Sequence, residues 1–171
     1  MKKLWFFLFV FCSLAVSSRL FAQDYSFHPV YIYNFTKYIQ WPSEKQTGDF
    51  VIGVYGKSPI FEKLKSMATN RTVGAQKIVV KEFASIEDMQ NCHIIFIPVG
   101  KSSSFPDVSS KVNSKPVLVI TEKSGLSKQG SGINFVVIEG KLKYELNKAS
   151  IDKSGLKVST DLIKLAILVN S

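Results

Sequence analysis

Apolar residues recur at helical spacing in one segment of this chain and form continuous runs in several others. In YIYNFTKYIQWP, residues 31–42, four of them stand at positions i, i+4, i+7 and i+8, on one face of a helix: Tyr31, Phe35, Tyr38 and Ile39. Pro29 suits a first helical turn, whereas Pro42 has no backbone donor and disfavours helical geometry in the residue before it. We therefore expect this helix to end near Gln40.

The continuous apolar runs predict buried strands with short helices between them. Val/Ile-rich runs of this kind are typical of strands that are covered on both faces of a parallel sheet. The predicted strands are residues 49–56, 76–83, 93–99 and 116–122. The predicted helices are residues 58–68, a helical turn at 85–91, and residues 105–113. We therefore expect an α/β fold, a three-layer α/β/α arrangement with a mainly parallel sheet flanked by helices on both faces.

The last third of the chain changes character. Residues 130–147 predict a C-terminal antiparallel hairpin about a Glu139/Gly140 turn, because apolar and charged residues alternate along its second strand. A short helix near 148–154 and a second over 159–169 follow. The second helix is apolar nearly all round, so it needs cover from the sheet or from a second subunit. Leu165 is accordingly either a core residue or an interface residue.

The N-terminus predicts a secretory signal peptide over residues 1–22. Two lysines precede an apolar run, Leu4 to Val16, and Ala22 precedes the expected cleavage point, with Ser18 as an alternative. The run is shorter than the roughly 20 residues that span a membrane, although an uncleaved anchor is the other interpretation. We expect an exported, periplasmic protein with one domain over residues 23–171.

The charge of the chain argues against a nucleic-acid partner. Removing residues 1–22 takes away three cations and no acid, which lowers the formal net charge from +9 to +6. The remaining lysines are scattered, whereas a nucleic-acid site needs a clustered and usually arginine-rich stripe. Weak attraction to acidic partners or to an anionic membrane surface stays open.

Cysteine use predicts no disulfide in the mature chain. Cys12 lies in the signal segment, which leaves Cys92 as a free thiol at the start of the strand-like run CHIIFIP. We expect a buried thiol, with a dimer-linking or redox-active thiol as the alternative.

Nothing in the sequence predicts catalysis. Gly56, Lys57 and Ser58 follow a strand, but the spacing does not fit a phosphate-binding loop. A nucleophile needs a nearby base, and the mature chain offers only His28 and His93, of which His93 is more simply structural. One cysteine and two distant histidines also fall short of a metal site. We expect no enzyme activity, no metal and no cofactor.

The aromatic residues of the first helix are the remaining candidates for binding. Their rings suit either core packing or contact with a partner or a small aromatic ligand. Helical spacing assigns Phe35 and Ile39 to the core, whereas Tyr33 lies off that face beside Lys37. The candidate contacts with a partner or ligand are Tyr33, Lys37, Tyr38, Trp41 and Leu165.

Six segments in order and spacing resemble the YfiR family of exported bacterial proteins: YNFTKYIQWP, FVIGVYGKSP, CHIIFIP, PVLVITE, GSGINFVVIEGKLKYELN and GLKVSTDLIKLA. The resemblance covers nearly the whole mature chain. It implies a periplasmic α/β protein, reported to be dimeric, that represses an inner-membrane diguanylate cyclase by binding its sensing domain. In that scheme lower cyclic-di-GMP synthesis reduces biofilm formation, and an outer-membrane lipoprotein relieves the repression.

This chain departs from the best-known member of that family in its cysteines. That member has paired cysteines linked to redox control, whereas only Cys92 stands at a matching position here. The resemblance supplies no catalytic residues. It favours a regulatory protein that binds a membrane sensor of the diguanylate cyclase or sensor kinase class. The alternative is a periplasmic sensor protein that binds a small molecule at the carboxyl ends of its strands.

Overall fold

The computed structural model describes residues 24–170, and most of its strands form one eight-stranded sheet in the order β10-β8-β7-β6-β5-β2-β4-β3. Strands β4, β2, β5, β6 and β7 run parallel, whereas β3 and β8 are antiparallel to their neighbours β4 and β7, and β10 is parallel to β8. A separate pair, β1 and β9, is antiparallel. The strands are β1 (Ile39–Gln40), β2 (Phe50–Tyr55), β3 (Thr72–Val73), β4 (Gln76–Phe83), β5 (Ile94–Ile97), β6 (Leu118–Thr121), β7 (Ile133–Ile138), β8 (Lys141–Leu146), β9 (Lys157–Val158) and β10 (Ile167–Leu168).

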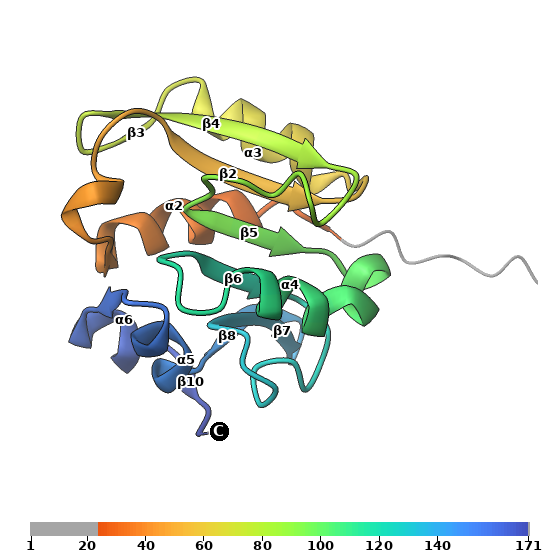
Figure 1. The fold of residues 1–171 in the computed structure, drawn as a ribbon. Coiled ribbons are helices and arrows are strands. Elements are labelled where there is room, and N and C mark those ends of the chain that lie inside the picture. The colour runs from red at the N-terminus through yellow and green to blue at the C-terminus, as the bar shows by residue number, and fades with distance from the viewer. Residues whose placement is uncertain (1–23, 171) are drawn as a thin grey trace, which may run out of the picture.

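Helices cover both faces of this sheet, as Figure 1 shows. Helices α2, α3, α5 and α6 contribute to the hydrophobic core on one face, and α4 to the core on the other. The predicted α/β fold with a mainly parallel sheet and helices on both faces is confirmed. The helices are α2 (His28–Tyr38), η1 (Ser43–Lys45), α3 (Ile60–Ala68), η2 (Val99–Ser104), α4 (Phe105–Lys111), α5 (Lys148–Lys153) and α6 (Thr160–Lys164).

The central strand β2 explains why its sequence is apolar without interruption. All six of its residues are buried. Ile52 and Val54 face the core under α2 and α3, while Val51 and Tyr55 face the core under α4. A strand covered on both faces has no solvent side, so alternation of polar and apolar residues disappears.

Pro29 lies at the start of α2 as expected, whereas the helix ends before Pro42 could limit it. The helix ends at Tyr38, two residues before the predicted end, because Ile39 takes up extended geometry with φ −112° and ψ 128°. Ile39 then pairs with Val158, so the chain passes directly from a helix into the β1–β9 ladder.

The predicted hairpin forms between β7 and β8. Glu139 and Gly140 both have positive φ, 52° and 71°, which suits a tight two-residue turn between twisted strands. Tyr144 and Leu146 of β8 are buried and Lys143 is exposed, which matches the predicted alternation.

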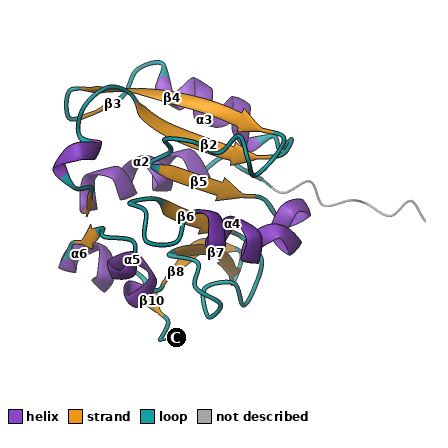
Figure 2. Ribbon diagram, in the orientation of Figure 1, coloured by secondary structure: helices purple, strands orange, loops and turns teal. Residues whose placement is uncertain are grey.

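The predicted helix over 159–169 is wrong in its second half. Helix α6 ends at Lys164, and Ile167–Leu168 instead pair with Glu145–Leu146 at the edge of the sheet. An apolar run fits a helix or a strand equally well, and here the unpaired edge of β8 provides the hydrogen bonds. The turn expected at 85–91 also forms no helix, only bends and turns (Figure 2).

No helix within residues 24–170 is long and apolar enough to span a membrane. The predicted signal peptide, residues 1–22, lies outside the described residues.

Candidate functional site

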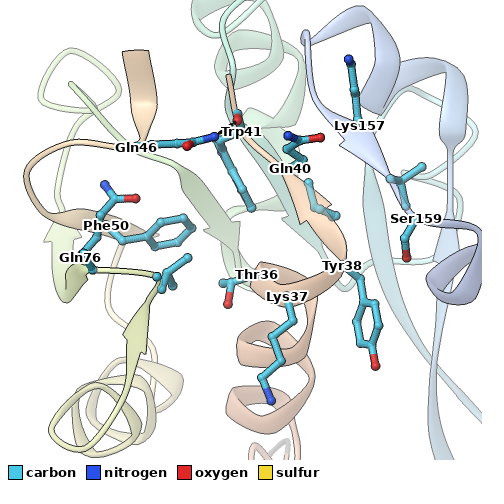
Figure 3. A pocket seen from close by; sticks show the side chains of 15 residues that line it. Thr36, Lys37, Tyr38, Gln40, Trp41, Gln46, Phe50, Gln76, Lys157 and Ser159 are labelled. Carbon is cyan, nitrogen blue, oxygen red and sulfur yellow. Dashed lines mark hydrogen bonds between the residues drawn. The ribbon is translucent and has the colours of Figure 1, made fainter. Parts of the chain in front are cut away.

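A cavity of about 650 Å³, here called the amino-end cavity, opens at the amino ends of β2 and β4 (Figure 3). Its walls come from the last turn of α2, the β1–β9 ladder and the turn between β3 and β4. The lining residues are Thr36, Lys37, Tyr38, Ile39, Gln40, Trp41, Gln46, Phe50, Val73, Gly74, Ala75, Gln76, Lys157, Val158 and Ser159.

The end of α2 creates one wall of this cavity. Pairing of Ile39 with Val158 brings β9 beside the helix end, and the backbone amide of Ser159 donates to the Tyr38 carbonyl at 2.8 Å. Lys157 and Ser159 therefore lie across from residues that precede them by more than a hundred positions.

Trp41 and Phe50 contribute aromatic rings to this cavity. The rings point toward each other in Figure 3, with centroids 5.0 Å apart in an edge-on arrangement. The Trp41 indole nitrogen donates to the His93 carbonyl at 3.3 Å, and only 5% of Trp41 is exposed. Trp41 is thus mainly a core residue that also lines the cavity, where it stays a candidate contact for a ligand.

His93 holds the loop behind Trp41. Its Nδ1 accepts from the Val51 amide at 3.0 Å, and its Nε2 bonds with the Lys45 carbonyl at 2.8 Å. Because a carbonyl only accepts, the proton of the neutral ring is on Nε2. Burial lowers the pKa of His93, so the ring is neutral at neutral pH. This agrees with the structural role expected for His93.

The charged groups around the amino-end cavity are all cationic. Lys37 and Lys157 line it, and none of the described residues lining it is an aspartate or glutamate. The side-chain amide of Gln46 donates to the Trp41 carbonyl at 2.8 Å, and that of Gln76 donates to the Lys45 and Thr47 carbonyls. The arrangement suits a small molecule with an apolar body and an anionic group.

Tyr33 lies beside Lys37, another predicted contact, but is not among the residues that line the amino-end cavity. Its ring is half-buried, with Lys37 Nζ 4.7 Å from the ring centroid and Arg71 Cζ 4.5 Å from it. The Arg71 contact joins α2 to the segment after α3, whereas Lys37 lies on α2 itself, four residues after Tyr33. Tyr33 therefore packs partly within the fold, and its role as a contact with a partner or ligand stays a prediction.

Tyr38 and Leu165 come together in a second depression, here called the Tyr38–Leu165 groove, with a volume of about 310 Å³. Tyr38 is 40% exposed and Leu165 is 76% exposed, the latter because α6 ends just before it. Tyr38 borders both this groove and the amino-end cavity. The residues of the groove are Tyr31, Asn34, Phe35, Tyr38, Lys143, Tyr144, Leu162 and Leu165.

Cys92 is a buried free thiol, the simpler of the two expected states. Its Sγ lies 3.6 Å from the Gln90 carbonyl oxygen, as a weak hydrogen bond. Burial raises the pKa of the thiol to about 11. The group is therefore protonated and unreactive at neutral pH.

A polar cluster that sequence reasoning missed lies at the opposite end of the sheet. The Tyr25 hydroxyl donates to Glu122 Oε1 at 2.7 Å, and the Val99 amide donates to the same oxygen at 2.9 Å. His28 Nε2 lies 3.8 Å from Glu122 Oε2, with both side chains almost fully buried. The available signal was the position of Glu122 directly after a buried strand, where α/β sheets commonly bind ligands.

Burial controls the protonation of this cluster. Desolvation lowers the pKa of His28 to about 4 and raises the pKa of Glu122. At neutral pH His28 is uncharged, so its contact with Glu122 is not a salt bridge, and 3.8 Å is too long for a hydrogen bond.

The comparisons with known proteins agree with the resemblance read from the sequence. A search of curated proteins found none that matches this chain. Residues 25–167 match the model of a protein family described as YfiR/HmsC-like. That family is associated with periplasmic regulation of diguanylate cyclase signalling. Since the match covers most of the sequence, the chain belongs to the YfiR/HmsC-like family.

Proposed function

We propose that this chain is an exported periplasmic regulator that binds the sensing domain of an inner-membrane signalling protein and lowers its output. By resemblance the partner is a diguanylate cyclase, and the regulated product is cyclic-di-GMP. The match of residues 25–167 to the YfiR/HmsC-like family is the observation that carries this proposal. The protein acts in this scheme by binding, without a catalytic step or a cofactor.

The Tyr38–Leu165 groove is the surface that we assign to the partner. Leu165 exposes most of an apolar side chain, and the rings of Tyr31 and Tyr38 border the same depression. Binding is favourable when a partner removes apolar surface of this kind from water. Lys143 at its rim adds a cation that suits an acidic partner surface.

Replacing Leu165 by aspartate tests this assignment. The exposed position tolerates a charge, so the L165D protein is expected to keep the wild-type melting temperature while losing the partner in crosslinking from envelope extracts. A cyclase partner should then make more cyclic-di-GMP in cells. Val99→Asp is the matched control, because Val99 is 46% exposed and lies outside the groove. If the L165D protein captured the partner as well as the wild-type protein does, the proposed surface would be contradicted.

The resemblance also implies a homodimer and an outer-membrane lipoprotein that sequesters the regulator, and a sensor kinase is the other class of membrane partner that we consider. These are parts of the same proposal. L165D separates two of them: a soluble monomer would assign Leu165 to the subunit interface, and an unchanged dimer without partner capture would assign it to the sensor.

A small-molecule sensor is the second candidate function, because the amino-end cavity offers aromatic edges, side-chain amides and two lysines in about 650 Å³. A thermal-shift screen of amino acids, nucleobases and aromatic metabolites tests it, since a ligand that binds the native state raises the melting temperature. The shift should shrink in a Lys37→Gln, Lys157→Gln double variant. Shifts that are equal in both proteins would place the ligand elsewhere.

A further inference from the structure

A cavity of about 900 Å³, here called the carboxyl-end cavity, lies at the opposite end of the sheet from the amino-end cavity. It opens between the first turn of α2 and the β7–β8 hairpin, beside the carboxyl end of β6. The lining residues are Asp24, Phe27, His28, Tyr31, Glu122, Val137, Gly140, Lys141, Leu142 and Lys143.

His28, in the wall of this cavity, has ring nitrogens whose hydrogen-bonding capacity is not used. The residue is only 2% exposed, and neither ring nitrogen has a hydrogen-bond partner. The neutral imidazole offers one donor and one acceptor. Buried polar groups are nearly always paired in native proteins, so an uncharged ligand group with both a donor and an acceptor would satisfy this ring.

The walls of the cavity are apolar and open to water. Phe27 is 63% exposed and Val137 is 69% exposed, and they line the same cavity from α2's N-terminal side and from the hairpin. Leu142 and Tyr31 continue the apolar surface, and the Tyr31 hydroxyl donates to the Leu142 carbonyl at 3.1 Å. A ligand that covered these side chains would remove apolar surface from water, which favours binding.

Charges around the cavity are unevenly placed. Lys141 and Lys143 stand on the hairpin side. The acidic residues that line the cavity are Asp24, just before α2, and Glu122, just after β6. A ligand carboxylate is therefore attracted to the hairpin side and repelled from the other.

We propose that the carboxyl-end cavity binds a short apolar peptide segment with a free C-terminal carboxylate. The carboxylate lies against Lys141 and Lys143, a backbone amide group meets His28, and apolar side chains cover Phe27 and Val137. A fatty acid would fill the apolar walls and pair with the lysines, but it would leave His28 unsatisfied. The segment is either a free peptide or the C-terminus of another protein.

Calorimetric titration with N-acetyl-Ala-Val-Leu-Val tests this proposal. The peptide acid is expected to bind about fivefold more tightly than its C-terminal amide, as two exposed ion pairs would give. A Lys141→Gln, Lys143→Gln variant should bind the acid and the amide equally. Lys111→Gln, Lys115→Gln is the matched control, since both lysines are exposed and lie outside the cavity, and it should behave as wild type.

Further arms of the experiment identify the source and the alternative ligand. The same four residues are appended to the C-terminus of a carrier protein, and binding of the carrier would identify a protein terminus as the source, whereas binding of the free peptide alone would identify free peptides. Either result supports the site. The proposal fails if no tested peptide binds, if octanoate binds as tightly as the peptide acid, or if the amide binds as tightly as the acid. Because Leu165 lies outside this cavity, partner capture by the L165D variant is decided independently.

Discussion

At the scale of single residues, the protonation of His28 links folding to acidity. Burial lowers its pKa to about 4 in the native state, against an ordinary value of 6.5. Between these two values the unfolded chain binds a proton that the native chain does not. Stability from this residue is therefore fully present above pH 6.5 and is lost as the pH falls toward 4.

We predict that His28→Gln flattens this dependence. From the two pKa values, the wild-type free energy of unfolding should lose about 2 kcal/mol from His28 between pH 7 and pH 5. The glutamine variant should lack that loss, because its amide does not titrate. Urea unfolding of both proteins at the two pH values measures the difference.

The opposing behaviour of Glu122 stays the same in both proteins. Burial raises the pKa of Glu122, so the stability linked to its protonated form is present at low pH and is lost as the pH rises through the native value. Comparing wild type with the His28 variant cancels this contribution. An identical fall in stability in the two proteins would refute the assignment to His28.

Residue-level prediction from the sequence worked where periodicity decides and failed where distant segments meet. Phe35 and Ile39 were assigned to the core by spacing and are buried. The Tyr25–Glu122 bond joins residues 97 positions apart, so no local pattern could indicate it. The bond between the Trp41 indole nitrogen and the His93 carbonyl joins residues 52 positions apart, so the burial of Trp41 was equally hidden from the sequence.

At the scale of elements, the C-terminal segment shows how one apolar run divides between two structures. Leu162 is buried in α6, and its carbonyl accepts the Tyr144 hydroxyl at 2.9 Å. Leu165, three residues later, is mostly exposed, and Ile167 already belongs to β10. Leu162 and Leu165 therefore differ in their contribution to stability despite identical chemistry.

We predict that Leu162→Ala lowers the free energy of unfolding by about 2–4 kcal/mol, because it leaves a cavity in the core. Leu165→Ala should change it by no more than about 0.5 kcal/mol, as is usual for exposed positions. Chemical unfolding of the two single variants checks both values. Equal destabilisation would mean that α6 continues through Leu165 into the core, as the sequence alone suggested.

Elements were predictable where proline, glycine or a turn fixed the backbone. Pro29 marks the start of α2, and the Glu139/Gly140 turn marks the hairpin. The apolar segment 159–169 carries no such marker beyond its start, where Ser159 accepts from the Leu162 amide at 3.3 Å. Its division into a helix and a strand depends on the edge of β8, which is tertiary information.

At the scale of the whole molecule, the two cavities lie at opposite ends of one parallel sheet. The strands run parallel, so Phe50 and Gln76, at the starts of β2 and β4, lie at one end of the sheet. Glu122, just after β6, lies at the other end. The sequence predicted the sheet, and it pointed to the carboxyl ends of the strands as the place where a small molecule would bind. It did not predict the amino-end cavity, because that cavity depends on β9 returning beside α2.

Helix α2 touches both cavities, since His28 in its first turn lines one and Tyr38 at its last position lines the other. Eleven residues make a stiff rod about 16 Å long. Any ligand that shifts this rod along its axis alters the dimensions of the distant cavity. Thermodynamic linkage then makes the effect mutual: the factor by which one occupant changes the affinity of the second equals the factor in the reverse direction.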